Sequence, residues 1–381
     1  MSLSSVVTGA GFVVLGLAVC GAIYACIATW AIWRFRSRAA PEPEALPSIS
    51  VLKPLHGDEP ELYENLASFC AQAYAGPVQL ILGAQDAADP ALAVAARLKQ
   101  AFPERDIVLV ADPTPHGTNR KIGNLINMGG HATGEVVVIS DSDVRLPADG
   151  LTRIVATLLA PGVGLIHCLY RGRPTASVWS KLAALDVNTR FAPSVVVGEA
   201  LGAHPCLGPT MALRAEVLAQ IGGLQLLADV LADDFELGRA VRAAGYRIAC
   251  PPMAIDHVFP ETSAREMVTH EMRWARTIRL VEPAGYLGSM IIHFTPLALI
   301  GAALTGFSGW SLAALAGLVA FRQVQALTLS KLMASDESLL WLLAVRDLLA
   351  FGVFLAAIFG DRVEWRGNRL RVGRDGAIAA T

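Results

Sequence analysis

Paired carboxylates occur at three places in the middle of the chain, in patterns that could hold a metal diphosphate. Asp86 and Asp89 lie within Gln85–Pro90, and Asp141 and Asp143 flank a serine. Hard cations such as Mg²⁺ and Mn²⁺ take oxygen ligands and can share them with a diphosphate. Such a cation would neutralise the charge that grows on a nucleotide diphosphate as it leaves. These segments therefore indicate group transfer from a nucleotide-linked donor.

The interpretation of the motif Asp141-Ser142-Asp143 depends on the apolar residues that precede it. Val136–Ile139 consists of β-branched residues only, which predicts a buried strand. A simple polar turn explains many such motifs on its own. At the end of a buried strand, binding of a metal diphosphate is an equal alternative.

The third carboxylate pair, Asp233-Asp234, opens a helix that we expect to run to about Ala244. Acidic residues are common at helix N-termini, where they cap the helix and interact with its dipole. The alternative is functional, because one carboxylate pointing into a cleft could accept the proton of an acceptor hydroxyl group.

A basic and aromatic segment, 270–279, follows these carboxylates and is predicted to be helical. Its Arg273-Trp274 pair suits a site, because a guanidinium can pair with a phosphate while the indole forms an apolar wall. Arg276 and Arg279 are better explained as a stripe that meets anionic lipids. Earlier in the chain, Lys121 could also reach a phosphate.

The composition indicates a membrane protein. Of the 381 residues, 54% are hydrophobic and only 17% are charged, which is too apolar for an ordinary soluble domain. The net charge of −2 gives no reason to expect nucleic acid as a partner. The six cysteines form no C-x-x-C pair, so neither a zinc site nor a disulfide framework is indicated.

An uncharged segment near the N-terminus predicts a membrane anchor. It runs from Val6 to Trp33 and is followed at once by Arg34 and Arg36. Its length exceeds the roughly 20 residues needed to cross a bilayer. The positive charges come after the apolar run, unlike those of a signal peptide, so we expect the anchor to remain and the following residues to be cytoplasmic.

Two further apolar regions follow near the C-terminus. The first, 288–321, is interrupted at 306–309 and predicts a helical hairpin with a short second arm; the second, 338–360, contains Arg346 and Asp347. The tail is rich in arginine, which favours the cytoplasm. Three full crossings would leave that tail outside, so we expect one of these segments to lie in the interface or to re-enter.

Between the membrane segments, strand-like and helix-like runs alternate. Residues 49–52, 80–82 and 107–110 predict strands in addition to 136–139, and 90–102 predicts a helix. This alternation is typical of a mostly parallel α/β sheet, in which ligands bind at the carboxyl ends of the strands. Residues 176–197 are either an amphipathic helix on the bilayer that guides a lipid acceptor or a helix facing the core.

Taken together, these clusters resemble glycosyltransferase family 21, the ceramide glucosyltransferase-like enzymes, over nearly the whole chain. The resemblance rests on motifs that occur here in the family's order and spacing. They are Ser50–Leu55, Gln85-Asp86 with Asp89-Pro90, Asn119 with Lys121 and Asn124, Asp141–Asp143, Asp233-Asp234, Arg273-Trp274 and Val363–Gly367.

The resemblance implies a GT-A (Rossmann-like) α/β nucleotide-sugar-binding domain with flanking transmembrane helices, a UDP-sugar donor, a divalent metal (Mg or Mn) and an inverting displacement. It places Asp234 as the catalytic base, with Arg273 and Trp274 in the final motif. Position 270, where the family usually has Gln or Arg, is His270 here. The implied nucleotide-sugar-binding residues are Asp86, Asp89, Lys121, Asp141 and His270, and the implied metal ligands are Asp141 and Asp143.

The expected organisation is an anchor over residues 1–38, a cytoplasmic transferase domain over 39–284, and C-terminal membrane segments with a basic tail over 285–381. The protein would be a multi-pass enzyme of the cell membrane that acts on a lipid. Ceramide is one acceptor that the resemblance implies. A similar bacterial branch, associated with hopanoid biosynthesis, implies transfer of N-acetylglucosamine to a hopanoid. A processive polysaccharide synthase and a non-catalytic nucleotide-sugar receptor are the rival functions.

Overall fold

The computed structural model describes residues 3–40, 42–336 and 338–360, together with the backbone of three strands in the tail. The strands are β11 (Arg362–Trp365), β12 (Asn368–Val372) and β13 (Ile378–Ala380). The tail motif 363–367 therefore lies only partly among the described residues, because 366 and 367 are outside them.

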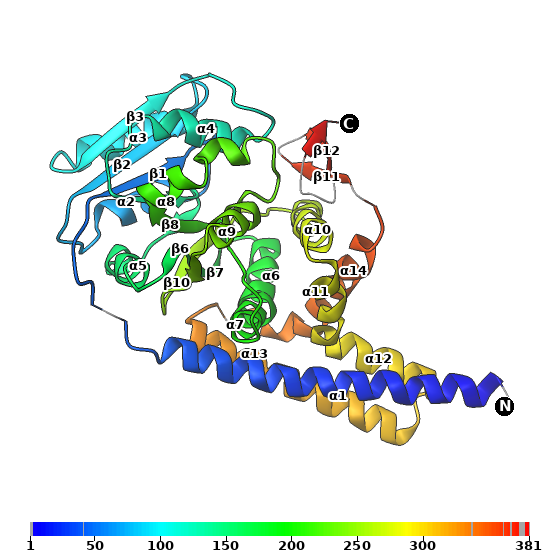
Figure 1. The fold of residues 1–381 in the computed structure, drawn as a ribbon. Helices are drawn as coiled ribbons and strands as arrows, with labels where there is room; N and C mark the ends of the chain where they lie inside the picture. The colour runs from blue at the N-terminus through cyan, green and yellow to red at the C-terminus, as the bar shows by residue number, and fades with distance from the viewer. Residues whose placement is uncertain are drawn as a thin grey trace.

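A seven-stranded sheet in the order β3-β2-β1-β4-β8-β6-β9 forms the centre of the α/β part (Figure 1). Strands β3, β2, β1 and β4 are parallel neighbours, β8 runs antiparallel between β4 and β6, and β9 is parallel to β6. The strands are β1 (Ile49–Pro54), β2 (Val78–Ala84), β3 (Asp106–Ala111), β4 (Val136–Ser140), β6 (Val163–His167), β8 (Thr210–Arg214) and β9 (Arg247–Ala249). The four strands predicted from the sequence are confirmed.

Helices cover both faces of this sheet, so that β4 is buried along its whole length. On one face lie α4 (Arg120–Gly129), α8 (Ala215–Gln220), η2 (Leu224–Leu227) and α9 (Asp233–Ala243). On the other lie α2 (Leu62–Cys70), α3 (Pro90–Ala101) and α5 (Gly150–Leu158). Helix α3 begins as predicted, because Asp89 accepts a hydrogen bond from the Ala91 amide and Pro90 occupies the first turn.

A second, three-stranded sheet in the order β5-β10-β7 adjoins the first. It consists of β5 (Val144–Arg145), β7 (Leu169–Pro174) and β10 (Ala254–Phe259). Packed with it are α6 (Val178–Asp186), the π-helical turn η1 (Val187–Phe191), α7 (Ala192–Ala200) and the long helix α10 (Ala264–Val281). Most of α6 and η1 is buried, which agrees with the core-facing alternative for this segment.

Among the described residues, four helical spans are long and apolar enough to cross a membrane: 4–36, 283–304, 309–333 and 340–357. They contain α1 (Leu3–Arg36), then α11 (Pro283–Gly288), η3 (Ser289–His293) and α12 (Phe294–Leu304), then α13 (Gly309–Met333), and finally η4 (Leu340–Leu342) with α14 (Leu343–Ala357). The expectation of a short second hairpin arm is wrong, since α13 has 25 residues.

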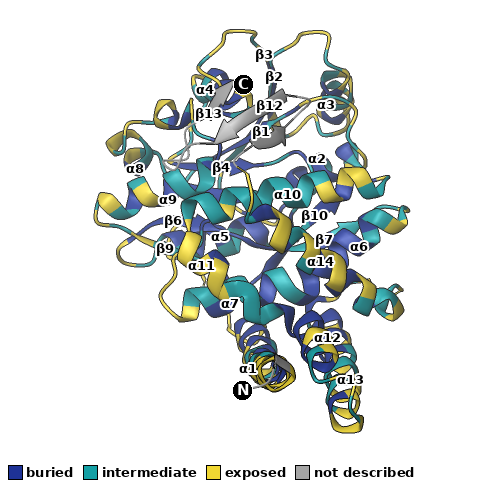
Figure 2. Ribbon diagram, turned by 90° about the vertical axis from the view of Figure 1, so that its right-hand side faces the viewer, coloured by how far each residue is buried: buried dark blue, intermediate teal, exposed yellow. Residues whose placement is uncertain are grey.

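Helices α1, α12 and α13 run side by side as a bundle that projects from the α/β part (Figures 1 and 2). Glycines bring α1 and α12 into close contact. A Cβ atom at Gly21 would lie 2.6 Å from the Cβ of Phe294, and one at Gly301 would lie 2.6 Å from the Cγ of Leu15. Small residues allow such backbone approach between membrane helices.

Helix α14 is held against the α/β part at both ends, unlike the bundle helices. Near its start, Arg346 Nε donates to the Leu182 carbonyl, 2.9 Å away, in α6. Just after its end, the Gly360 carbonyl accepts from Arg279 of α10 at 2.6 Å. The helix therefore lies along the α/β part.

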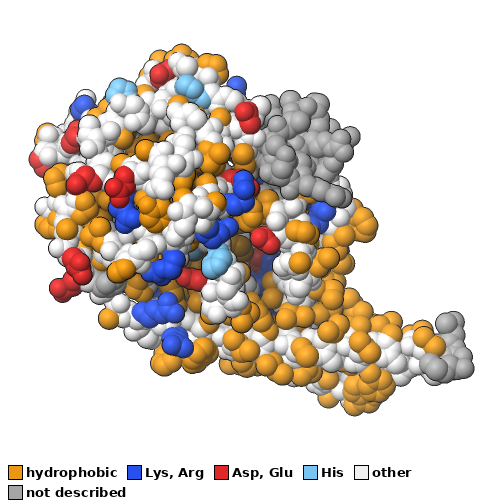
Figure 3. All heavy atoms as spheres, viewed as in Figure 1, with side chains coloured by type: hydrophobic (Ala, Val, Ile, Leu, Met, Phe, Trp, Pro, Cys, Tyr) orange, Lys and Arg blue, Asp and Glu red, His pale blue; other side chains and the backbone are white. Residues whose placement is uncertain are grey.

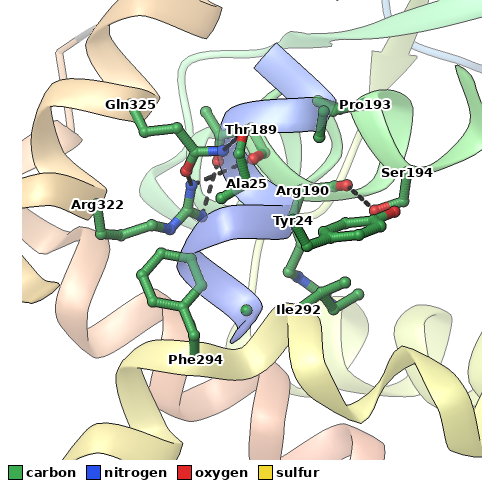
Figure 4. A pocket seen from close by; sticks show the side chains of 12 residues that line it. Tyr24, Ala25, Thr189, Arg190, Pro193, Ser194, Ile292, Phe294, Arg322 and Gln325 are labelled. Atoms are coloured by element: carbon green, nitrogen blue, oxygen red, sulfur yellow. Dashed lines mark hydrogen bonds between the residues drawn. The ribbon is translucent and has the colours of Figure 1, made fainter. Parts of the chain in front are cut away.

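Largely buried charges join the α/β part to the apolar helices; we call them the junction cluster. Its members are Asp186, Arg190, Glu271, Arg322, Arg346 and Asp347. Arg322 pairs with Asp347 at 3.0 Å. Figure 4 shows its guanidinium beside Thr189 and Gln325, to which it donates. The cavity beside them measures about 20 Å³, room for about one water molecule.

Candidate active site

Carboxylates from two distant segments meet at the carboxyl edge of the central sheet. Asp141 follows β4 directly, and its amide donates to the Pro209 carbonyl just before β8. Lys121, in the first turn of α4, contacts Asp141 Oδ1 at 2.8 Å and Asp233 Oδ2 at 3.4 Å. We call Lys121, Asp141, Asp143, Asp233 and Asp234 the carboxylate site.

Lys121 is positioned by the cap of its own helix. The Asn119 side chain accepts from the Ile122 amide and donates to the Val230 carbonyl at 2.7 Å. The same residue thus starts α4 and ties it to the loop before α9. This fixes the lysine between the two carboxylate pairs, which lie far apart in the sequence.

The two carboxylates of the Asp141-Ser142-Asp143 turn differ in electrostatic environment. Desolvation raises the pKa of Asp141, although Lys121 acts against it. Desolvation also acts to raise the pKa of Asp143, but His257, with Nε2 3.1 Å from Asp143 Oδ2, outweighs it and the pKa is lowered. Asp143 is therefore the more readily ionised of the two.

These residues fit a divalent cation. Asp143 Oδ1 is enclosed and has no hydrogen-bond partner in the described structure, so it is available as a ligand. Carboxylate oxygens suit Mg²⁺ and Mn²⁺. No group of three or more His, Cys, Asp or Glu within the described ranges forms a complete cage. Oxygens from elsewhere, such as a diphosphate, would have to complete the coordination.

Lys53 lies beneath this turn and was missed by the sequence analysis as a site residue. Its fully buried Nζ donates to the carbonyls of Asp141 at 2.7 Å and Val144 at 3.4 Å and lies 3.8 Å from the centre of the Phe69 ring. Burial lowers its pKa to about 7, although Asp143 and Asp141 act in the opposite direction. The sequence pattern that could have identified Lys53 is a lysine within an otherwise largely apolar strand.

Asp234 has the environment expected of a base. Its carboxylate accepts hydrogen bonds from the amides of Phe235 and Gly208. Burial, with the neighbouring charge of Asp233, raises its pKa to about 6. The carboxylate is thus ionised near pH 7 and can take up a proton more readily than an ordinary aspartate.

Helix α10 brings His270 and Trp274 to an aromatic cluster beside the carboxylate site. Their ring centres lie 4.2 Å apart, and Trp274 also packs edge-on against Phe259. His270 Nδ1 lies 2.6 Å from Glu261 Oε1, which fixes the orientation of its ring. Arg273, the other predicted member, is close enough to lower the pKa of His270, although burial is the larger cause.

His257 links this aromatic cluster to the carboxylate site. Its ring packs 6.5 Å from Trp274 and edge-on against Tyr170, while Nε2 contacts Asp143. The sequence analysis left His257 and Glu261 unassigned. A histidine within a strand-like run was the pattern that could have identified His257. No pattern in the sequence marked Glu261.

Asp86 and Asp89 lie at the same sheet edge, in the loop after β2, but no described contact joins them to the carboxylate site. Both carboxylate oxygens of Asp89 accept from the Gly57 amide, at 2.9 and 3.0 Å, in addition to the bond that caps α3. Asp86 is exposed and accepts from the Ala88 amide. Of the two, Asp86 has the more accessible carboxylate.

The sequence of the chain matches a known family of enzymes. The sequence model of Glycosyl transferase family 21 matches residues 13–378. Ceramide glucosyltransferase 1 of Caenorhabditis elegans is 22% identical over 366 residues, which cover 92% of this chain and 76% of that protein. An N-acetylglucosaminyltransferase of Bradyrhizobium diazoefficiens is 25% identical over 251 residues, covering 61% of this chain and 49% of its own.

Among solved structures, the mannosyltransferase PcManGT from Pyrobaculum calidifontis, in complex with GDP-Man and Mn²⁺, superimposes with a TM-score of 0.54. The match covers 92% of this chain and 99% of that one at 20% sequence identity. At this identity the likeness establishes the fold, and it confirms the predicted GT-A architecture.

Proposed function

Because the chain belongs to glycosyltransferase family 21, we propose that it transfers a sugar from a UDP-sugar to a hydroxyl group of a membrane lipid, with inversion at the anomeric carbon. The observation that carries this proposal is the contact of Lys121 with both Asp141 and Asp233. This contact brings Asp141, which would hold a metal diphosphate, next to the Asp233-Asp234 pair. Asp234 is the member of that pair suited to deprotonate an acceptor.

On the donor side, Lys121 and the Asp141-Ser142-Asp143 turn would hold the diphosphate. Asp141 and Asp143 would bind the divalent cation, Mg²⁺ or Mn²⁺, which when bound neutralises charge on the departing diphosphate. The resemblance puts the family's nucleotide-side aspartate at Asp89, but Asp86 has the more accessible carboxylate and would contact the nucleoside. Asp89 supports that loop through its bonds to backbone amides.

On the acceptor side, Asp234 would accept the proton of the lipid hydroxyl group. The oxygen attacks the anomeric carbon as the bond from that carbon to the diphosphate oxygen breaks, so the product is inverted and UDP leaves. Trp274 would form an apolar wall, Arg273 would pair with a phosphate, and His270 would contact the donor from the same helix. Glu261 would keep His270 in one orientation.

A ceramide glucosyltransferase-like reaction is the leading candidate, supported by the family and by the nematode relative, which covers more of the chain than the bacterial one. Transfer of N-acetylglucosamine to a hopanoid is the second candidate, supported by the bacterial relative. A processive synthase is disfavoured because the apolar helices offer a poor translocation channel.

We propose that α1, α12 and α13 cross the cell membrane while α14 lies on its surface. Arg34 and Arg36 end α1, which favours a cytoplasmic α/β part. Since α12 and α13 form a hairpin and both ends of α14 contact the α/β part, the arginine-rich tail would also be cytoplasmic. A C-terminal tag that is accessible only from outside would contradict this arrangement.

The reaction is tested by incubating membranes that contain the protein with labelled UDP-glucose or UDP-N-acetylglucosamine. Lipid extracts are compared with glycosylated ceramide and hopanoid standards. A labelled lipid is the expected product, whereas a long water-soluble polymer would support the synthase alternative.

The same assay separates an enzyme from a receptor. Asp234→Asn should lower turnover by about 10²–10⁴-fold, the usual contribution of general base catalysis. Asp106→Asn, at an exposed position at the start of β3, is the matched control and should retain full turnover. Full activity of Asp234→Asn would refute the assignment of the base.

A further inference from the structure

An apolar groove of about 370 Å³ lies between α10 and α14. Its volume falls in the range of small-molecule sites. Every residue that lines it is aliphatic, methionine or glycine. Val268 and Met272 line it from α10, and Val345, Leu349, Gly352 and Ala356 are among those that line it from α14.

The charges of α14 point away from this groove, into the protein. Arg346 is 1% exposed and contacts Glu271 at 2.5 Å, and Asp347 pairs with Arg322. The exposed face bears only apolar side chains among the described residues of this helix. Large ones at and around it include Val345 (52% exposed), Trp341 (73%) and Phe359 (74%). A face of this kind is covered by hydrocarbon or by another protein.

The position of the exposed apolar face of α14 indicates what covers it. Figure 2 shows α10, α11 and α14 on the side from which the bundle of α1, α12 and α13 projects toward the viewer. In Figure 3, hydrophobic side chains continue from the bundle onto the same side of the α/β part. If the bundle crosses a bilayer, this face meets the bilayer surface, and the groove opens toward lipid.

Helix α10 alone separates the groove from the aromatic cluster of the site. Val268 and Met272 face the groove, while His270 and Trp274 contact each other and Phe259. A helix with its side chains is about 10–12 Å across. A lipid chain in the groove would thus lie within about one helix diameter of residues that face the reaction.

We propose that this groove binds the hydrocarbon part of the lipid acceptor and so holds the acceptor's hydroxyl end at the α10 side of the carboxylate site. The proposal rests on the proposed lipid glycosyltransferase function. Bulk lipid can cover the exposed face of α14, but a groove walled by the helix of Arg273 and Trp274 selects the molecule that must react.

The test fills the groove from Gly352. A Cβ atom there meets nothing within 4 Å, so Gly352→Phe can project into the groove without a backbone clash. Gly317→Phe is the matched control, because Gly317 lies exposed on α13 and is equally uncrowded. The acceptor is whichever of ceramide and hopanoid the wild-type enzyme glycosylates. It is used with its full apolar part, called the long-chain acceptor, and with that part shortened, called the truncated acceptor.

In Gly352→Phe, the KM for the long-chain acceptor should rise at least about tenfold, the effect of losing about two buried methylenes. The KM for the truncated acceptor and for the donor should not change, and Gly317→Phe should match the wild type. Equal KM values for the long-chain acceptor in both variants would overturn the proposal while leaving the proposed function intact.

A second measurement does not depend on turnover. Versions of ceramide, the hopanoid and phosphatidylcholine that carry a diazirine in the apolar part are photolysed with wild-type membranes, and the labelled peptides are mapped. The acceptor probe should label 264–281 or 343–357, and Gly352→Phe should abolish that label. Equal labelling by phosphatidylcholine, or no label there, would overturn the groove. Absence of lipid glycosylation by the wild type would instead overturn the proposed function.

Discussion

The carboxylate site and the junction cluster both concentrate charge inside the protein, but only the junction cluster balances it. In the junction cluster, each carboxylate faces an arginine, as in Asp186 with Arg190 and Asp347 with Arg322. In the carboxylate site, Lys121 is shared between Asp141 and Asp233, and Asp143 Oδ1 has no hydrogen-bond partner.

This difference separates a structural role from a binding role. Buried charges are costly unless they are paired, so a balanced set can join two parts of a protein without any ligand. A set of carboxylates that shares one lysine has oxygens left over to coordinate a cation. The junction cluster therefore fits a structural role, and the carboxylate site fits the metal and diphosphate binding that we propose for it.

The largest expected effect is that of removing the metal. Chelation should lower transfer by about 10³-fold or more, because metal stabilisation of a leaving group contributes several kcal/mol. Mg²⁺ or Mn²⁺ should restore activity and raise the midpoint of thermal unfolding, which is measured alongside turnover. Unchanged activity in a chelator would show that the carboxylate site needs no metal, which would contradict the difference in role between the two clusters.

Breaking the junction cluster should affect stability rather than chemistry. Asp347→Asn leaves Arg322 buried without its counter-ion, which should lower the free energy of unfolding by about 3–5 kcal/mol. Thermal inactivation in detergent measures the loss, and initial rates before inactivation should be normal. The double variant Arg322→Leu with Asp347→Leu should recover much of the stability, since no charge is left unpaired.

Lys53 is predicted to position the metal-binding turn from below. Lys53→Met removes the donor to the Asp141 and Val144 carbonyls and should raise the KM for donor or metal by about tenfold to a hundredfold. Lys53→Arg should restore part of the loss. Lys99→Met, at an exposed position on α3, is the control. A purely structural lysine would lower the amount of folded enzyme without changing KM.

The pH dependence should report Asp234. Its pKa is raised to about 6, so the base form is present above that pH and is lost as the pH falls through it. Turnover should drop about tenfold for each pH unit below about 6. Asp233→Asn removes the neighbouring negative charge and should move this acid limb to lower pH. If the acid limb does not move, it does not report the ionisation of Asp234.

The smallest expected effect comes from crowding the base. A Cβ atom at Gly208 would lie 3.1 Å from Asp234 Oδ2, so Gly208→Ala should displace the carboxylate by a few tenths of an ångström. We expect kcat to fall about three- to tenfold, with donor KM unchanged. Gly198→Ala on α7, where the nearest contact is 3.7 Å, should behave like the wild type.

Much of the fold could be predicted because it depends on local patterns. The β-branched run 136–139 identified the central strand, and Asp89-Pro90 identified the start of α3. The meeting of Lys121 with Asp233 could not be predicted from spacing, since it depends on how β8 and the loop before α9 are placed. Lys53 was overlooked because its partners are mostly backbone carbonyls.

The membrane segments show where sequence patterns mislead. The apolar run in the sequence ends at Phe321, before a charged residue, but α13 continues to Met333. The helix can continue because Arg322 finds Asp347 and Thr189 within the protein. Likewise, the charges within 338–360, Arg346 and Asp347, have partners such as Glu271 that belong to segments that the pattern could not connect.

The close packing of α1 on α12 has a consequence for biosynthesis. Gly21 leaves the ribosome long before the residues it packs against, Ile291 and Phe294. At about 5–20 residues per second, the delay is on the order of tens of seconds. If α1 crosses the membrane as we propose, it must stay there during that time with its glycine face uncovered, while the α/β part emerges and begins to fold. Helix α1 therefore presents one side of an interface whose other side is synthesised only with the last third of the chain.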